Sequence, residues 1–231
     1  MEHGLNIPKE RQIPPLYQFT AKAFLWMFIG LLATGITGVY LYGSGLARTI
    51  AMNRTLPFVF AGLQLLLVIV LSSRIQKLSI GASRTIFIAY SVLTGVTFSS
   101  LGYMYNIRTI FVAFLFTAVL FGCLSFIGFT TKKDMTSFGP LLLGGLVALI
   151  IINIIGIFIN LTAFDLFIGL AGVLIFLGLT AYDTQKMKRT YTMVQNDHLM
   201  LEKLSIFFAL QLYLDFINIF LYLLRIMGRR D

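Results

Sequence analysis

Apolar residues dominate the chain in seven long blocks separated by short polar connections. Each block is about 20 residues long, which is what an α-helix rising ~1.5 Å per residue needs to cross ~30 Å of hydrocarbon. Short connections make consecutive helices antiparallel neighbours, so we expect one bundle over residues 23–228, preceded by a cytoplasmic N-terminal tail over residues 1–22. The predicted membrane helices cover residues 23–43, 56–72, 86–103, 110–130, 140–160, 166–184 and 204–224.

Two of these blocks each contain one acidic residue. Asp183 lies near the end of the sixth block and Asp215 in the middle of the seventh. A carboxylate inside a membrane helix costs several kcal/mol, so an intramembrane acid indicates a functional site. Two other interpretations stay open: Asp183 as a solvated acid at a helix end, and Asp215 as a partner in a structural hydrogen bond or ion pair.

A polar stripe shows which face of the seventh block is turned inward. Gln211, Asp215, Asn218 and Tyr222 are spaced by four, three and four residues, so they share one face of a helix. Such a stripe does not face lipid, and the neighbouring helix carries Asp183. Two carboxyl groups in one site of low dielectric constant do not both ionise easily, so the pair is predicted to share one proton. When doubly ionised it would be a site of hard oxygen ligands suited to Ca²⁺.

Other polar residues in the blocks are candidates for supporting roles along an ion path. Asn153 and Asn160 are seven residues apart on one helix face, and each needs a hydrogen-bonding partner in the bundle. Gln64 is the polar side chain of the second block. Arg74, at the end of the second block, is predicted at the same depth as Asp183, where it would favour the ionised acid. Alternatively, Arg74 only anchors its helix at the membrane surface.

Composition supports a polytopic α-helical membrane protein, an all-α fold class. Hydrophobic residues make up 58% of the chain and charged residues 12%, and the mean hydropathy is +0.89. The short alternating strands of a membrane β-barrel are not visible. The net charge of +9 comes from Lys and Arg in short connections, where they meet anionic lipid, so we expect no nucleic-acid partner.

Cys123 is the single cysteine, which excludes an intramolecular disulfide. We expect no cleavable signal peptide and no cofactor.

The distribution of positive charge predicts the orientation of the chain. Twelve Lys and Arg residues fall in the N-terminal tail and the even-numbered connections, and six fall in the odd-numbered connections and the C-terminal tail. The positive-inside rule therefore places the N-terminus in the cytoplasm and the C-terminus outside. Three arginines in the C-terminal tail, Arg225, Arg229 and Arg230, oppose this assignment. A six-span protein with both ends in the cytoplasm is the alternative topology.

The segments around the two acids closely resemble the transmembrane Bax inhibitor motif family. These segments are GLTAYDTQKMK (178–188) and LYLDFINIFLYLLRIMG (212–228). Similarity to the bacterial branch extends to LSSRIQKLSIG (71–81), LTGVTFSS (93–100) and GFTTKKDMTSFG (128–139), so it covers about residues 20–230. The resemblance implies a seven-helix bundle whose last helix is central, in a bacterial inner membrane. It also implies a pH-sensitive Ca²⁺ leak.

The resemblance assigns roles to three residues of this chain. Asp183 and Asp215 match a di-aspartyl pH sensor, and Arg74 matches an arginine that latches to the first acid in the closed state. Some members carry an acidic residue in the second helix, where this chain has Gln64. The implied partners are membrane lipids, protons and Ca²⁺ as the transported ion. The sequence does not identify a protein partner.

Two other functions use the same pair of acids. A proton-coupled cation antiporter would also need intramembrane carboxyl groups that titrate. An intramembrane aspartyl protease carries two aspartates on adjacent helices, but its second aspartate stands in a glycine-rich GxGD motif. Here Tyr213 and Leu214 precede Asp215, so we expect the protein not to be an enzyme.

Overall fold

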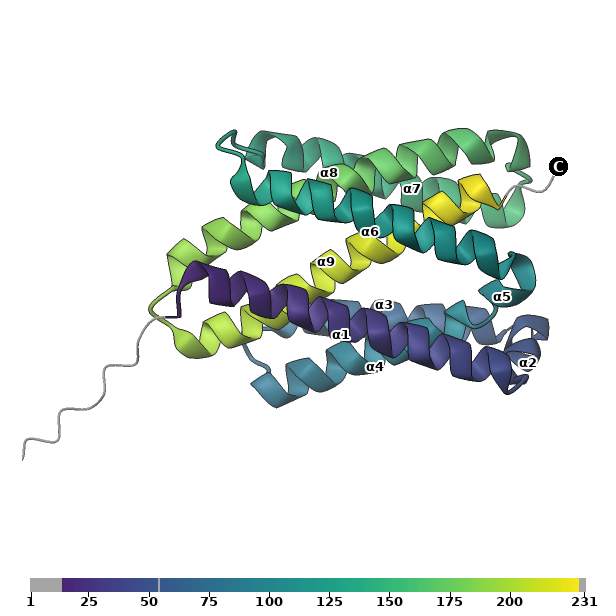
Figure 1. Ribbon diagram of the computed structural model, residues 1–231, viewed down its shortest axis with the longest axis horizontal. Coiled ribbons are helices and arrows are strands. Elements are labelled where there is room, and N and C mark those ends of the chain that lie inside the picture. Colours follow the sequence, from purple (N-terminus) through teal and green to yellow (C-terminus); the bar gives the residue numbers. More distant parts are fainter. Residues whose placement is uncertain (1–13, 54, 229–231) are drawn as a thin grey trace, which may run out of the picture.

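The computed structural model describes residues 14–53 and 55–228 and is helical almost throughout (Figure 1). Seven of its helical segments are long and apolar enough to cross a membrane, which confirms the predicted fold class. Within the described part the helices are α1 (Leu16–Gly43), α2 (Leu46–Met52), α3 (Leu56–Arg74), α4 (Ile80–Phe98), α5 (Leu101–Met104), α6 (Ile107–Thr130), η1 (Thr136–Phe138), α7 (Gly139–Phe158), η2 (Thr162–Phe164), α8 (Asp165–Val194) and α9 (His198–Met227).

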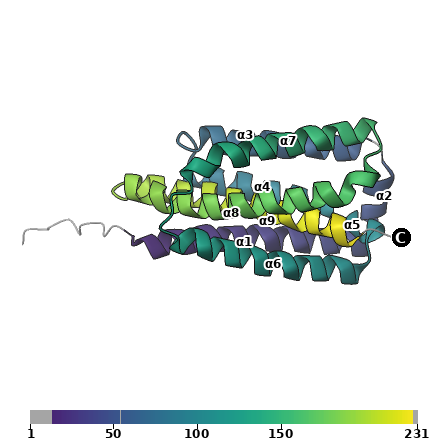
Figure 2. The same ribbon diagram turned by 90° about the horizontal axis from the view of Figure 1, so that it is seen from above.

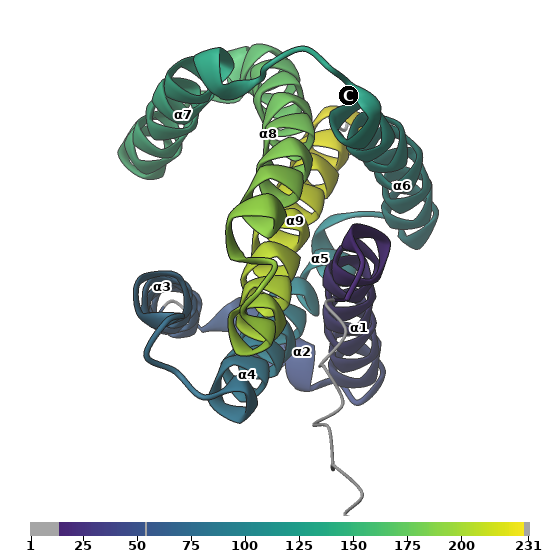
Figure 3. The same cartoon turned by 90° about the vertical axis from the view of Figure 1, so that its left-hand side faces the viewer.

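Helix α9 lies at the centre of the bundle, as the resemblance implied. Figure 2 shows three layers, with α3 and α7 on one face, α8 and α9 in the middle, and α1 and α6 on the other face. Figure 3 shows α8 and α9 crossing the middle of the bundle. In its most apolar window α9 is 67% buried, whereas α3 and α7 are 6% buried. Buried apolar side chains of α9 therefore form much of the core, and α3 and α7 turn most of their surface outward.

The odd number of spans places the two described ends of the chain at opposite ends of the bundle (Figure 1). We call the end that holds the connection between α8 and α9 the α8–α9 end. We call the other, which holds Gly228, the C-terminal end. Because helices alternate in direction, the α6–α7 connection lies at the α8–α9 end, and the α7–α8 connection lies at the C-terminal end.

Several helices are longer than their apolar blocks. Helix α1 begins at Leu16, within the predicted tail, of which residues 1–13 lie outside the described residues. Helix α8 continues to Val194 and α9 begins at His198, so most of the predicted polar connection is helical. Local capping explains such boundaries: the Asp197 side chain accepts a hydrogen bond from the backbone N–H of Met200 and caps α9. Apolar blocks mark the membrane-spanning part of a helix rather than its ends.

Hydroxyl and glycine residues pack α4 against α1. The hydroxyls of Ser91 and Thr94 donate to carbonyls one turn earlier in α4, at 3.0 and 2.9 Å, as expected for packing residues. A Cβ atom on Gly95 would lie 2.6 Å from the carbonyl oxygen of Thr34 in α1. The two backbones approach this closely because glycine leaves the space free.

Replacing Gly95 by valine is therefore expected to destabilise the bundle by about 1–3 kcal/mol, the usual cost of overpacking a well-packed site. Thermal unfolding in detergent measures the change. Gly122→Val in α6 is the matched control, because no atom lies within 4 Å of the Cβ position at Gly122. Equal stabilities of the two variants would contradict close α1–α4 packing at Gly95.

Candidate functional site

A cavity of about 560 Å³ lies between α7, α8 and α9, inside the membrane-spanning part of the bundle. Asp183 of α8 and Asp215 of α9 both line it, so the structure brings the two predicted acids into one site. The remaining lining residues are Leu143, Leu146, Leu149, Ile150, Asn153, Ile154, Ile157, Phe176, Leu179, Tyr182, Lys186, Gln211, Leu214, Asn218 and Tyr222. The cavity thus has a mostly apolar wall on α7 and a polar wall on α8 and α9.

Both acids are withdrawn from the surface. Asp183 is 7% exposed and Asp215 is 3% exposed. In the part of the chain that the structure describes, the Oδ2 atom of Asp215 and the Oε1 atom of Gln211 are buried without a hydrogen-bond donor. An unpartnered buried acceptor usually costs about 1–3 kcal/mol, and native proteins contain few of them. Two such acceptors one helical turn apart leave this wall with oxygen atoms that can accept hydrogen bonds or coordinate a cation.

The polar stripe of α9 lines the cavity along its length. Gln211, Asp215, Asn218 and Tyr222 all contribute to the lining, as their spacing predicted. The amide nitrogen of Asn218 donates to the carbonyl of Leu214 at 2.8 Å. Because Asn218 uses its amide nitrogen within its own helix, its amide oxygen is the group available to an occupant.

Lysine 186 supplies the positive charge next to Asp183. It follows Asp183 by one turn of α8, lines the same cavity, and its Nζ atom lies 5.9 Å from the centre of the Tyr182 ring. Arg74 is exposed at the last residue of α3 and forms none of the ion pairs found among the described residues. The structure therefore does not bring Arg74 to the acids. Lys186 was not predicted as a site residue, because it follows the end of the predicted sixth membrane helix at residue 184.

Two of the predicted supporting residues lie away from the cavity lining. The amide of Gln64 donates to the hydroxyls of Thr94 and Thr97 at 3.4 and 3.3 Å, which fastens α3 to α4. Asn160 follows the end of α7, where its side chain accepts a hydrogen bond from the backbone N–H of Thr162 at 3.0 Å. Asn160 is thus a turn residue and does not continue the helix face of Asn153.

Asn153 belongs to a network that closes the C-terminal end of the cavity. Its amide nitrogen donates to the Tyr222 hydroxyl at 3.0 Å, and its amide oxygen accepts from Arg225 at 3.3 Å. The Nε atom of Arg225 donates to Asp165 at 2.9 Å, and the pair is a salt bridge. One guanidinium therefore ties the last turn of α9 to the start of α8 and to α7.

Sequence reasoning missed Asp165 because it fell in a predicted connection rather than in an apolar block. The pairing gives Arg225, one of the C-terminal arginines that opposed the predicted orientation, a partner within the bundle. Arg229 and Arg230 lie outside the described residues.

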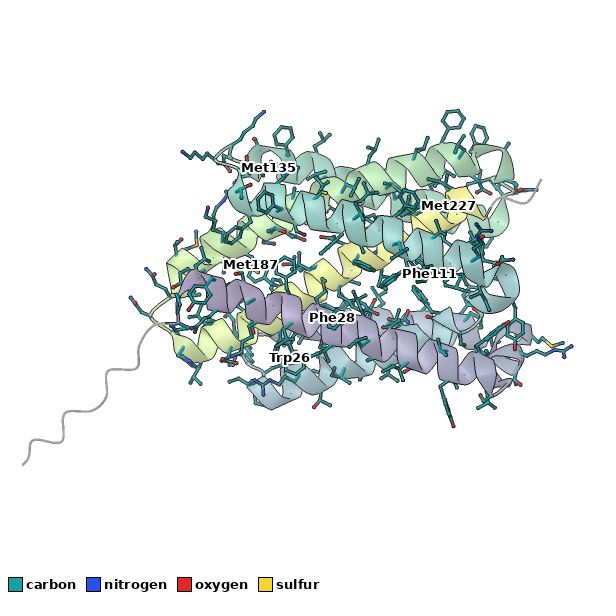
Figure 4. The ribbon with its side chains drawn as sticks, in the orientation of Figure 1. Trp26, Phe28, Phe111, Met135, Met187 and Met227 are labelled. Atoms are coloured by element: carbon teal, nitrogen blue, oxygen red, sulfur yellow. The ribbon has the colours of Figure 1, made fainter. Side chains whose placement is uncertain are left out.

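At the α8–α9 end, Gln185 anchors the connection between α6 and α7, in which Figure 4 labels Met135. The buried Gln185 side chain accepts from the backbone N–H of Met135 and donates to the carbonyl of Lys133, both at 2.8 Å. Hydrogen bonds from Thr136 to Asp134 in this connection, with the nearby Arg189 guanidinium, hold the pKa of the Asp134 carboxyl below its ordinary value. Gln185 follows Asp183 by two residues, so the connection is fastened close to the first acid.

Within the described residues, no group of three or more His, Cys, Asp and Glu side chains could hold a metal ion. The predicted calcium ligands, Asp183 and Asp215, line the cavity together with Gln211 and Asn218, whose side chains also carry amide oxygens. Such a mixed set suits a hard cation, since Ca²⁺ takes carboxylate and amide oxygens.

Fold and site together define an integral membrane protein whose central helix carries a buried acid next to a second one. The sequence model of the family described as "Inhibitor of apoptosis-promoting Bax1" matches residues 16–231, and the chain belongs to this family. It is 41% identical to the inner membrane protein YbhL of Escherichia coli strain K12 over 217 residues, 93% of each chain. It is also 39% identical to a protein of Deinococcus radiodurans, over 98% of this chain and 97% of that protein.

Proposed function

We propose that this protein is a pH-sensitive calcium leak of a bacterial inner membrane, controlled by proton sharing between Asp183 and Asp215. The observation that carries the proposal is the single cavity that both acids line within the membrane-spanning part of the bundle. Membership of the Bax inhibitor family supports it, and the inner-membrane relative YbhL supports the location.

The chemistry of the cavity suits a divalent cation. A charge of +2 entering a region of low dielectric constant needs compensating negative charge and oxygen ligands. Ionised Asp183 and Asp215 would supply two negative charges, and one shared proton would halve that charge. Between pH 6 and pH 8 the proton activity changes about 100-fold, so the ratio of protonated to ionised pair changes by the same factor.

Orientation follows from the positive charges of the connections. We place the α8–α9 end in the cytoplasm and the C-terminal end outside. Asp183 then lies toward the cytoplasm, and the Arg225 network closes the cavity toward the outside. A closed-state latch between Arg74 and Asp183 requires α3 to move toward α8, and it stays a prediction.

The test is Ca²⁺ flux into liposomes that contain the purified protein, at pH 6, 7 and 8. We expect wild-type flux to change several-fold over this range, and the flux of Asp183→Asn and Asp215→Asn to lose this dependence. Asp197→Asn is the matched control, because asparagine caps a helix about as well as aspartate, so its flux should follow the wild type.

Two outcomes would contradict the proposed calcium leak. Absence of flux at every pH from a folded, inserted protein would leave the acids structural and overturn the proposed leak. Flux that accelerates under an imposed proton gradient, with the pH on the α8–α9 side held constant, would identify proton-coupled exchange by the same two acids.

A further inference from the structure

A second cavity, of about 460 Å³, lies on the other side of α9, between α1 and α6. Its floor is formed by Phe216, Ile217 and Phe220 of α9, and its walls include Gly35 of α1 and Phe111 of α6. Figure 4 labels Phe111, which projects from α6 toward the space between α6 and α1. The two cavities share no lining residue, so this one is separate from the acidic site.

The Thr34 and Ser99 hydroxyls at this cavity are already hydrogen-bonded. Thr34 donates to the carbonyl of Ser91 at 2.8 Å and lies 2.6 Å from the Tyr213 hydroxyl. The Ser99 hydroxyl donates to the carbonyl of Val96 at 2.6 Å. A buried water needs two to four polar partners, and an apolar cavity of this size takes an apolar ligand instead. The apolar lining of this cavity therefore favours a hydrocarbon ligand over water.

The cavity is open to the side, toward the lipid. Val39 of α1 and Phe111 of α6 line it and are 75% and 59% exposed. Gly35 has no atom within 4 Å of its Cβ position, so the missing side chain leaves room in the wall. In a membrane the surrounding medium at this position is the acyl chains of the bilayer, which can enter between α1 and α6.

Residues near the C-terminal end of this cavity are those that usually meet lipid headgroups. Tyr42 lines the cavity, and its ring lies 5.0 Å from the ring of Tyr103. Arg108 is exposed in the first turn of α6, next to Ile107, which also lines the cavity. Tyrosine and arginine at the edge of the hydrocarbon favour a phosphate headgroup at this level.

We propose that this cavity binds one acyl chain of a membrane phospholipid, whose phosphate lies at Arg108. Three features carry the assignment: a dry apolar lining, a lateral opening at the depth of the acyl chains, and a cationic, aromatic edge where a headgroup would lie. The site does not depend on calcium transport, because it shares no residue with the acidic cavity.

The test is native mass spectrometry of the purified protein in detergent with added dioleoyl phosphatidylglycerol. We expect wild type to hold one lipid per chain and Gly35→Phe, which fills the cavity, to lose at least 90% of it. Gly62→Phe in α3 is the matched control, because Gly62 is exposed, has no atom within 4 Å of its Cβ position and lines neither cavity. Arg108→Gln should weaken retention several-fold.

A second measurement needs no variant and so does not depend on the folding of Gly35→Phe. A phospholipid with a photoactivatable group in its acyl chain should label wild type within residues 31–39 and 107–114. Equal lipid retention by wild type and Gly35→Phe, or label spread evenly over the exposed helices, would overturn the proposal. A lipid-free dimer that Gly35→Phe disrupts would also overturn it and would identify a second copy of the chain as the occupant.

Discussion

Asp215→Leu is expected to abolish the proposed calcium leak and, at the same time, to make the protein more stable. Asp215 is 3% exposed, and its Oδ2 atom has no donor among the described residues. Leucine has the same branching and the same number of side-chain heavy atoms, and apolar residues of α7 line the same cavity. Removing a buried acceptor that has no donor relieves a cost of about 1–3 kcal/mol, so we expect a gain in stability of that order. If Asp215 is needed for function and lowers stability, its replacement should remove the flux and raise the stability together.

Thermal unfolding in detergent, together with liposome flux, measures both effects in one preparation. Thr180→Val is the matched control on α8, because the Thr180 hydroxyl is buried and already donates to the Phe176 carbonyl at 2.8 Å. We expect the control to change stability by less than about 1 kcal/mol and to leave the flux unchanged. A less stable Asp215→Leu protein would instead show that Asp215 holds the bundle together.

The sequence was sufficient to predict the seven spans and the inward face of α9. Both predictions use regular features of the sequence. The length of each apolar block matches the thickness of the bilayer, and the spacing of Gln211, Asp215 and Asn218 follows the helical repeat. The location of Asp183 and Asp215 at one cavity was also predictable, because consecutive antiparallel helices lie side by side.

Contacts between distant helices were not predictable in the same way. The partner of Arg225 lies 60 residues away at the start of α8, and no local pattern marks it. Arg74 was placed by its depth alone, which does not fix the position of α3 around the bundle. Asn153 and Asn160 share a helix face only if α7 continues, and α7 ends at Phe158. The sequence period therefore predicts how deep a residue lies in the membrane and which helix face turns inward. The position of each helix around the bundle is determined by packing between helices that are distant in the sequence.

The Arg225 network provides a test of which helix moves when the cavity opens. Helix α7 packs mainly against α8 and is otherwise largely exposed. Its link to α9 at the C-terminal end of the cavity consists of the hydrogen bonds from Asn153 to Tyr222 and from Arg225 to Asn153. Because these bonds join the two walls of the cavity, we infer that breaking them lets α7 move away from α9.

Arg225→Gln should therefore increase the proposed leak about tenfold, the factor expected when an opening barrier falls by ~1.4 kcal/mol. It should also lower stability by about 1–2 kcal/mol, since it removes a charge-assisted pair whose side chains are 28% and 27% exposed. Arg48→Gln, an exposed arginine of α2 at the same end, is the control and should leave the flux unchanged. If the pair acts as a unit, Asp165→Asn should add little to Arg225→Gln in a double-mutant cycle, whereas additive effects would separate Asp165 from the closure.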